Sequence, residues 1–284
     1  AQSWSDWTLL ISDDGSSDNT ASIIAEFCAN DVRIEYLEPR EGPAGHAGNF
    51  EYLLSSALDR GADFIFLADQ DDIWLPEKVG LMLDRASSGD NGPLAIFSDL
   101  EVVDAAGRQL GGFLEIHRLQ GPHDVKSLLS QNTVVGCSTM VNASLLSLAL
   151  PFPEHLQNHD WWLGLCAAAS GSLLQLPEKL VRYRQHEGNV VGALGTSSRI
   201  LLMRQILQRQ RRVFWGKLSA VEELIRRLNS AGSEVPEVLP AWWDQFSTAD
   251  GWSRPWQLLR SEFKPGSRQL LLVQLLALSP LVND

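Results

Sequence analysis

Residues 63–72 read DFIFLADQDD, a short apolar run that ends in three carboxylates. The apolar part, Asp63–Ala68, predicts a buried strand. Similar short runs at 7–12, 33–37 and 94–98 are separated by stretches of helical composition. Strands and helices that alternate at this spacing predict βα units, and therefore an α/β protein with a mostly parallel sheet.

The carboxylates of Asp69, Asp71 and Asp72 follow this strand directly. Like charges repel, so a cation is the natural way to hold them together, and hard oxygen ligands suit Mg²⁺ or Mn²⁺. A solvated acidic turn before the helix at Trp74 is the alternative. Ligands of parallel sheets bind beyond the carboxyl ends of the strands. The cluster lies at such an end, which favours a metal site.

A second acidic loop, Asp13–Asp18, follows the strand at 7–12. Its first two carboxylates, Asp13 and Asp14, could accept hydrogen bonds from a base or a ribose near a helix start. Taken alone, the loop is better explained by a plain β-turn with a helix cap. It does not match a calcium-binding loop, because the twelfth position from Asp13 is Ile24.

The segment NHDWW at 158–162 places Asp160 between a histidine and two indoles. An aspartate beside apolar aromatic surface can have a raised pKa, which suits it to accept a proton from a hydroxyl. The indole faces of Trp161 and Trp162 would also make platforms for sugar rings. A helix-capping aspartate with two core tryptophans is the better interpretation of the segment alone.

The segment RYRQHEGN at 182–189 offers two guanidiniums, a histidine and an asparagine after an expected strand. Arg184 suits a diphosphate, and His186 could complete a metal site. An exposed basic loop is the alternative interpretation.

The 284 residues carry a formal net charge of −12, divided unevenly. Residues 1–160 hold 25 acidic and 8 basic residues, whereas residues 161–284 hold 10 and 15. The net charges of the two parts are therefore −17 and +5. A strongly acidic chain is a poor partner for phosphate backbones, so we expect no nucleic-acid binding. The basic remainder suggests contact with anions.

The three cysteines, Cys28, Cys137 and Cys166, have no CxxC spacing and an odd total. They indicate buried small apolar residues in a reducing compartment. No secretory signal is apparent at the start of the chain. The longest apolar run, Gln269–Val282, is shorter than the roughly 20 residues of a spanning helix. We therefore expect a cytoplasmic protein.

Residues 196–284 form a helical C-terminal extension, separate from a domain at 1–195. The stretch 199–229 is amphipathic, and its first part is basic without an acid. Such a helix could lie peripherally on the inner face of an anionic plasma membrane. A lid packed on the core or the interface of a homo-oligomer would explain it equally well.

Five segments in this order resemble the family-2 inverting glycosyltransferases of the GT-A fold, whose sheet is Rossmann-like. They look closest to the bacterial rhamnosyltransferase-like branch, which builds surface polysaccharides such as O-antigen. The similarity covers about residues 1–195, and five motifs in register are a strong signal. The matching segments are Leu9–Thr20, Gly45–Leu54, Phe66–Val79, His159–Leu163 and Tyr183–Ala193.

The resemblance implies a role for each matching residue. Asp160 corresponds to the general base, and Asp13 and Asp14 correspond to the contacts to the nucleotide's base and ribose. Asp69 and Asp71 match the Asp-x-Asp motif, in which the first acid lies near the ribose and the last binds the divalent metal. The basic motif near the diphosphate and the metal corresponds to Arg184 and His186. A loop that lines the donor pocket corresponds to His46 and Asn49.

The implied reaction is metal-dependent transfer of a sugar from a nucleotide-diphosphate donor, with dTDP-rhamnose suggested by the branch. The acceptor would be a saccharide or a lipid-linked saccharide. Members of the family normally begin with a further strand and helix, about 30 residues by analogy with a βα unit. This sequence begins where that unit ends, so we expect an incomplete donor pocket.

Two other functions fit parts of the pattern. A strand followed by Asp-x-Asp is also similar to the haloacid-dehalogenase-like phosphatases, but these have Thr or Val where this sequence has Ile73. A degenerate transferase domain could instead serve as a non-catalytic sugar- or partner-binding module. The expected absence of a first strand favours that module. The presence of Asp69, Asp71, Asp160 and His186 argues against it.

Overall fold

The computed structural model describes residues 2–40, 45–89, 91–117, 119, 121–185, 199–249, 253–263, 265 and 268–279. The strands are β1 (Leu9–Ile11), β2 (Ile34–Tyr36), β3 (Phe64–Phe66), β4 (Ile73–Trp74), β5 (Leu94–Val103), β6 (Gln109–Gly112), β7 (Thr139–Asn142) and β8 (Ser172–Arg184). The helices are α1 (Thr20–Asn30), α2 (His46–Asp59), α3 (Lys78–Ser87), α4 (Phe113–Ile116), α5 (Val125–Ser130), the 3₁₀ turn η1 (Gly136–Ser138), α6 (Ala143–Ala149), α7 (His159–Ser170), α8 (Arg199–Ser230), α9 (Val238–Ser247), α10 (Ser253–Arg260) and α11 (Arg268–Ala277).

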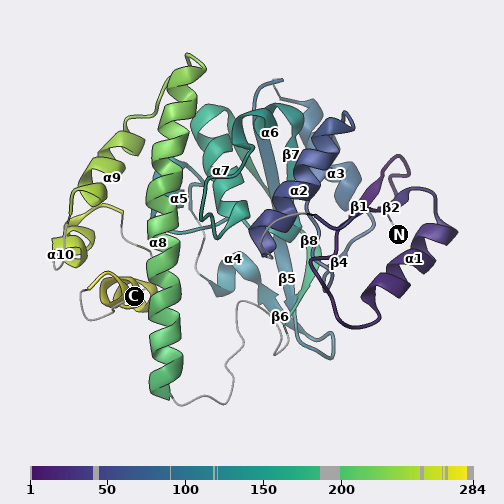
Figure 1. Ribbon diagram of the computed structural model, residues 1–284, viewed down its shortest axis with the longest axis horizontal. Coiled ribbons are helices and arrows are strands. Elements are labelled where there is room, and N and C mark those ends of the chain that lie inside the picture. The colour runs from purple at the N-terminus through teal and green to yellow at the C-terminus, as the bar shows by residue number, and fades with distance from the viewer. Residues whose placement is uncertain are drawn as a thin grey trace.

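The first two strands form a small sheet of their own. β1 and β2 pair in parallel, with Leu9 opposite Ile34, and α1 packs against β2. Within the described ranges, no strand pairing joins this sheet to the larger one, in which β3 forms one edge. The expected strands at 7–12 and 33–37 are thus confirmed, and they stand apart at one end of the molecule (Figure 1).

The larger sheet has six strands in the order β3-β7-β5-β8-β4, with β6 paired to β5. Only β5 and β8 pair in parallel within it. The α/β class and the C-terminal helices are confirmed, and the direction of pairing is more mixed than expected. One reason is that a tight turn at Asp104–Arg108 joins β5 to β6, and strands joined so closely run antiparallel.

Two elements differ from their expected bounds. The strand expected at 179–183 extends back to Ser172, because β5 accommodates Pro177 through a shift in register between Ser98 and Asp99. The helix expected at Trp74 starts at Lys78, since Ile73 and Trp74 pair with β8 instead.

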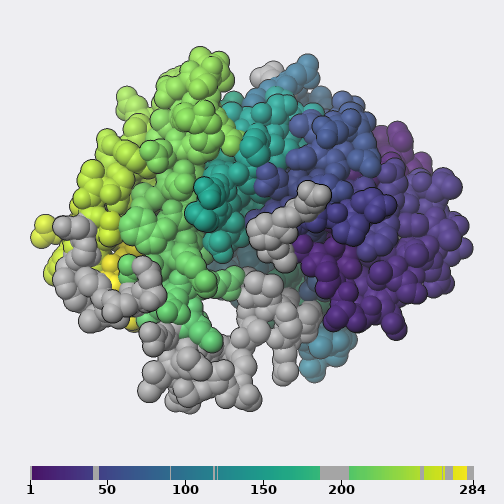
Figure 2. Space-filling view, viewed as in Figure 1, coloured from purple at the N-terminus to yellow at the C-terminus, as the bar shows by residue number. Residues whose placement is uncertain are grey.

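The C-terminal helices share one hydrophobic core with the sheet domain. Buried side chains of α5, α6 and α7 belong to the same cluster as Leu224 of α8 and Trp242 of α9. Trp161 and Trp162 of α7 are among the largest fully buried side chains in this cluster. Figure 2 shows the C-terminal helices on the side of the molecule opposite the N-terminal residues. Burial of such large apolar groups ties α8 to the domain, at roughly 1.5–3 kcal/mol for each side chain.

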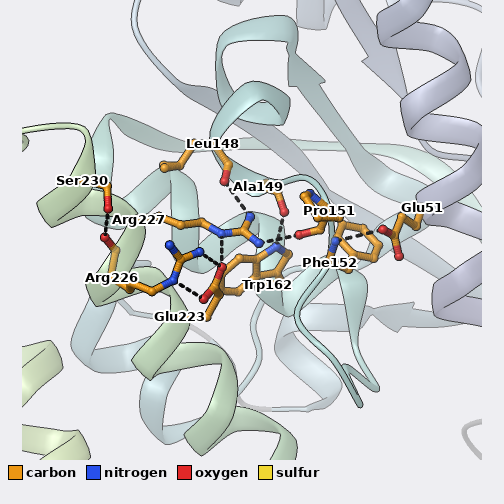
Figure 3. A network of polar contacts seen from close by, with 10 residues as sticks. All are labelled: Glu51, Leu148, Ala149, Pro151, Phe152, Trp162, Glu223, Arg226, Arg227 and Ser230. Atoms are coloured by element: carbon orange, nitrogen blue, oxygen red, sulfur yellow. Dashed lines mark hydrogen bonds and ion pairs between the residues drawn. The ribbon is translucent and has the colours of Figure 1, made fainter.

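A partly buried arginine of α8 fixes this packing (Figure 3). Arg227 Nη1 and Nη2 donate to the carbonyls of Leu148 and Pro151, at 2.8 and 2.6 Å. Its Nε donates to Glu223 at 2.7 Å, and the guanidinium lies 5.6 Å from the centroid of the Trp162 ring. The carbonyls at a helix C-terminus have no partner within the helix. Arg227 therefore supplies the donors that the end of α6 lacks.

We expect Arg227→Met to lower the free energy of unfolding by about 1–3 kcal/mol, because the carbonyls of Leu148 and Pro151 lose a charged donor. Arg226→Met is the matched control, since Arg226 bonds the same Glu223 from the exposed side of α8. Urea denaturation of the two variants measures the difference. Equal midpoints would show that the carbonyl contacts of Arg227 contribute nothing.

Among the described residues, no helix combines the length with the apolar composition that crossing a bilayer requires. The apolar run at 269–282 gives α11, which has 10 residues.

Candidate active site

The candidate residues meet at the carboxyl end of β3. The ring of His46, at the start of α2, lies with its Nε2 4.0 Å from Asp69 Oδ1 in the loop after β3. The rings of His46 and His159, at the start of α7, have centroids 4.8 Å apart. The backbone N–H of Arg184, at the end of β8, donates to Asp72 Oδ1 at 3.2 Å. Four segments of the chain thus converge on one site.

The acidic loop after β3 offers a cation site. Ligand atoms of Asp69, Asp72 and Cys137 all lie within 4.8 Å of one another, the one such group in the described part of the chain. Asp72 Oδ2 is buried and has no hydrogen-bond partner. Burial raises the pKa of Asp72, while hydrogen bonds from the Cys137 thiol and the Arg184 N–H oppose the rise. An unpartnered carboxylate oxygen beside a second carboxylate fits a divalent cation.

The structure therefore pairs Asp69 with Asp72, whereas Asp71 is not a member of this group. Asp71 contributes its backbone carbonyl, which accepts a hydrogen bond from Arg184 Nε. Burial raises the pKa of the Cys137 thiol, which leaves two carboxylates as the ligands that suit Mg²⁺ or Mn²⁺. His186, the third expected ligand, lies outside the described residues.

A buried lysine lies beneath this cluster. Lys78 is fully buried, donates to the carbonyl of Cys137 at 2.7 Å and lies 3.3 Å from the centroid of the Trp74 ring. Burial lowers its pKa well below the usual range, and the nearby Asp72 and Asp69 oppose this effect. The sequence analysis did not single out Lys78. The sequence offered one signal for this contact, the position of Lys78 four residues after Trp74.

Asp160 occupies the first turn of α7, where a negative charge is favourable. Its Oδ1 accepts the N–H of Trp161 at 2.7 Å, and the backbone N–H of Gly136 in η1 also donates to it. Burial raises the pKa of Asp160 to about 6, and the charge of Asp69 adds to the rise. A carboxylate with a pKa near neutrality is suited to take a proton from a hydroxyl.

His159, the residue before Asp160, forms a stacked pair of rings with Phe50. His159 is 3% exposed, and its ring stacks on Phe50 at 4.1 Å. Neither ring nitrogen of His159 has a hydrogen-bond partner, and burial lowers its pKa to about 3. His159 is therefore neutral at physiological pH. A Cβ at Gly136 would lie 3.0 Å from His159 Nε2, so a larger residue would push against this ring.

The acids after β1 organise two loops. Asp13 accepts hydrogen bonds from the N–H and the hydroxyl of Ser16 at 3.0 and 2.6 Å. Asp14 forms an ion pair with Arg40 at 2.9 Å and accepts the N–H of Gly45 at 2.6 Å. This contact places the start of α2, and His46 with it, beside the end of β1.

Asn49 makes the corresponding contact from α2. Its Nδ2 donates to the carbonyl of Ser12, and its Oδ1 accepts the hydroxyl of Ser12 at 2.7 Å. Contact of Asp13, Asp14 or Asn49 with a nucleotide-sugar donor remains a prediction.

The expectation that Trp161 and Trp162 form a platform for a sugar is wrong. They are 1% and 0% exposed, because α5, α6 and α8 all pack against α7. Their indole N–H groups donate to the carbonyls of Leu128 and Ala149, at 2.8 and 2.9 Å. Neither ring has an open face on which a sugar could stack.

Comparison with known proteins agrees with this geometry. Residues 1–106 match the family model described as glycosyl transferase family 2. The N-terminal part of the chain is therefore similar to the family-2 glycosyltransferases. The rhamnosyltransferase-like branch is supported by the relatives that the chain resembles.

One relative of the chain is the dTDP-rhamnosyl transferase RfbG of Shigella flexneri. It is 29% identical over 204 residues, which cover 66% of each protein. Another is an Escherichia coli protein, the UDP-Glc:alpha-D-GlcNAc-diphosphoundecaprenol beta-1,3-glucosyltransferase WfgD. It is 28% identical over 194 residues, which cover 66% of this chain and 70% of the relative. The chain thus spans about two-thirds of the length of these proteins.

We expect Asp72→Asn to weaken Mn²⁺ binding at least tenfold, because one of two paired carboxylates loses its charge. Asp84→Asn, on the exposed side of α3, is the matched control and leaves the affinity unchanged. Titration with Mn²⁺ by electron paramagnetic resonance measures free and bound ion. Equal affinities in wild type and Asp72→Asn would exclude Asp72 as a ligand.

Proposed function

We propose that this protein is a family-2 glycosyltransferase that transfers a hexose from a nucleotide-diphosphate donor to a hydroxyl of a saccharide or lipid-linked acceptor, with inversion. The observation that carries the proposal is the arrangement of Asp160. A carboxyl whose pKa burial raises to about 6 lies within the electrostatic reach of Asp69, at the edge of a carboxylate pair suited to a cation.

The reaction that we propose is a single displacement. Asp160 accepts the proton of the acceptor hydroxyl while the hydroxyl oxygen attacks the anomeric carbon. The bond from this carbon to the diphosphate breaks on the opposite face, and one displacement inverts the centre. No covalent intermediate on the chain is needed.

The remaining site residues orient the donor. Arg184, whose backbone and side chain contact Asp72 and Asp71, would bind the diphosphate. His46, Asn49, Asp13 and Asp14 would border the nucleotide. Bound Mg²⁺ or Mn²⁺, held by Asp69 and Asp72 with Asp71 or His186 as further candidates, would neutralise charge that develops on the leaving diphosphate. Without such a cation the acidic edge would repel the donor.

The relatives suggest the substrates. The name of RfbG specifies a dTDP-rhamnosyl donor, and that of WfgD specifies an acceptor with a diphosphate-linked lipid. We propose dTDP-rhamnose as the first donor to test and the synthesis of a bacterial surface polysaccharide as the process. A lipid-linked acceptor would place the reaction at the inner face of the plasma membrane.

Asp160→Asn keeps the shape of the side chain and removes the base, so we expect the transfer rate to fall by about 10²–10⁴. Donor affinity, measured by calorimetry, stays within twofold of wild type. Asp84→Asn serves as the control with one exposed charge removed. If wild type and Asp160→Asn are equally inert while the donor still binds, the chain is a binding module and the catalytic proposal fails.

The rate of transfer depends on the ionised form of Asp160, so it should rise with pH up to a midpoint near 6 and then level off. The sign follows from the raised pKa of this carboxyl, since protonation below the midpoint removes the acceptor of the proton. Initial rates between pH 4.5 and 8 measure the profile. A rate that does not change between pH 5 and 7 would contradict the role of Asp160.

A further inference from the structure

Helix α8 approaches the start of α7 more closely than most side chains would allow. A Cβ at Gly216 would lie 3.0 Å from the carbonyl oxygen of His155, in the loop before α7. The glycine therefore lets α8 pack against the residues that lead to Asp160. This contact brings the next side chain of α8, Lys217, to the same place.

The ammonium of Lys217 is enclosed but poorly satisfied. Its Nζ lies 4.7 Å from the centroid of the Trp161 ring and donates to the carbonyl of Leu128 at 3.5 Å. That carbonyl already accepts the indole N–H of Trp161 at 2.8 Å. An ammonium has three donors, and in the described part of the chain Lys217 forms no ion pair. Two donors therefore remain for another acceptor.

A small cavity lies at this ammonium. Its volume is about 10 Å³, and Lys217, Trp161, Gln157 and Asn158 are among its lining residues. This is room for about one water-sized group, such as a water or a single ligand oxygen. Asn158 and Trp161 flank Asp160 in the sequence, and the charge of Asp160 acts on Lys217, so the cavity lies near the proposed base. Burial lowers the pKa of Lys217 to about 8, and the charge of Asp160 opposes the lowering.

The basic composition of the first part of α8 favours binding of an anion. Residues 199–221 contain six basic side chains, including Lys217, and no acid. By contrast, the donor side of the site carries Asp69 and Asp72. An anionic group of the acceptor would therefore be repelled from the donor side and attracted to α8.

We propose that Lys217 binds a phosphate oxygen of the acceptor, with the cavity beside Asp160 as the subsite. This inference rests on the proposed function, because it assigns the acceptor side of the same site. It names the class of acceptor, a saccharide phosphate, and makes α8 a part of the binding site.

The test uses binding alone, so it stays informative even if transfer is never observed. The probes are N-acetylglucosamine 1-phosphate, neutral N-acetylglucosamine and inorganic phosphate, each titrated calorimetrically into the full chain. We expect wild type to bind the sugar phosphate at least tenfold more tightly than the neutral sugar. Lys217→Met removes this preference, and Lys217→Arg retains at least part of it. Lys126→Met, which removes an exposed lysine of α5 paired with Glu262, leaves it intact.

Inorganic phosphate distinguishes the source of the anion. We expect it to compete with the sugar phosphate in wild type and not in Lys217→Met. Equal competition in both, an unchanged preference in Lys217→Met, or no preference in wild type would overturn the proposal. Burying an ammonium is costly, so Lys217→Met is expected to fold, and its denaturation midpoint checks this.

Discussion

The repulsion between carboxylates at the carboxyl end of β3 constrains the rest of the site. Burial raises the pKa of Asp72 and of Asp160, and the charge of Asp69 adds to both rises. The fold offsets part of this cost with the buried Lys78, which lies beneath the pair, and with backbone N–H groups from Arg184, Trp161 and Gly136. A divalent cation would bind to the remaining negative charge, and the diphosphate of the donor would bind to that cation.

The C-terminal helices complete this arrangement from the other side. Arg227 and the apolar face of α8 fix α8 against α6 and α7. Because α7 carries Asp160 on its first turn, the position of the proposed base depends on contacts made more than 60 residues later in the chain. The division at residue 195 remains a prediction, and the shared core shows that the two parts pack as one body.

The sequence predicted the strands and the edge where their acids gather, because an apolar run followed by charge has few other interpretations. It did not distinguish Asp72 from Asp71. That choice depends on β4, a two-residue strand that pairs with Arg182 and Val181, far along the chain. Lys78 and Lys217 resemble surface lysines in the sequence, since only tertiary packing buries them. Likewise, the sequence allows the indoles of Trp161 and Trp162 to face either solvent or the core. The packing of α5, α6 and α8 against α7 buries both of them.

The proposed function depends most on the use of a nucleotide-sugar by this site. A donor screen by mass spectrometry, with Mn²⁺ or Mg²⁺ and a saccharide-phosphate acceptor, tests it directly. We expect one nucleotide-sugar to yield nucleoside diphosphate and glycosylated acceptor in equal amounts. If a nucleotide-sugar binds but no donor yields nucleoside diphosphate with either metal, the claim is contradicted.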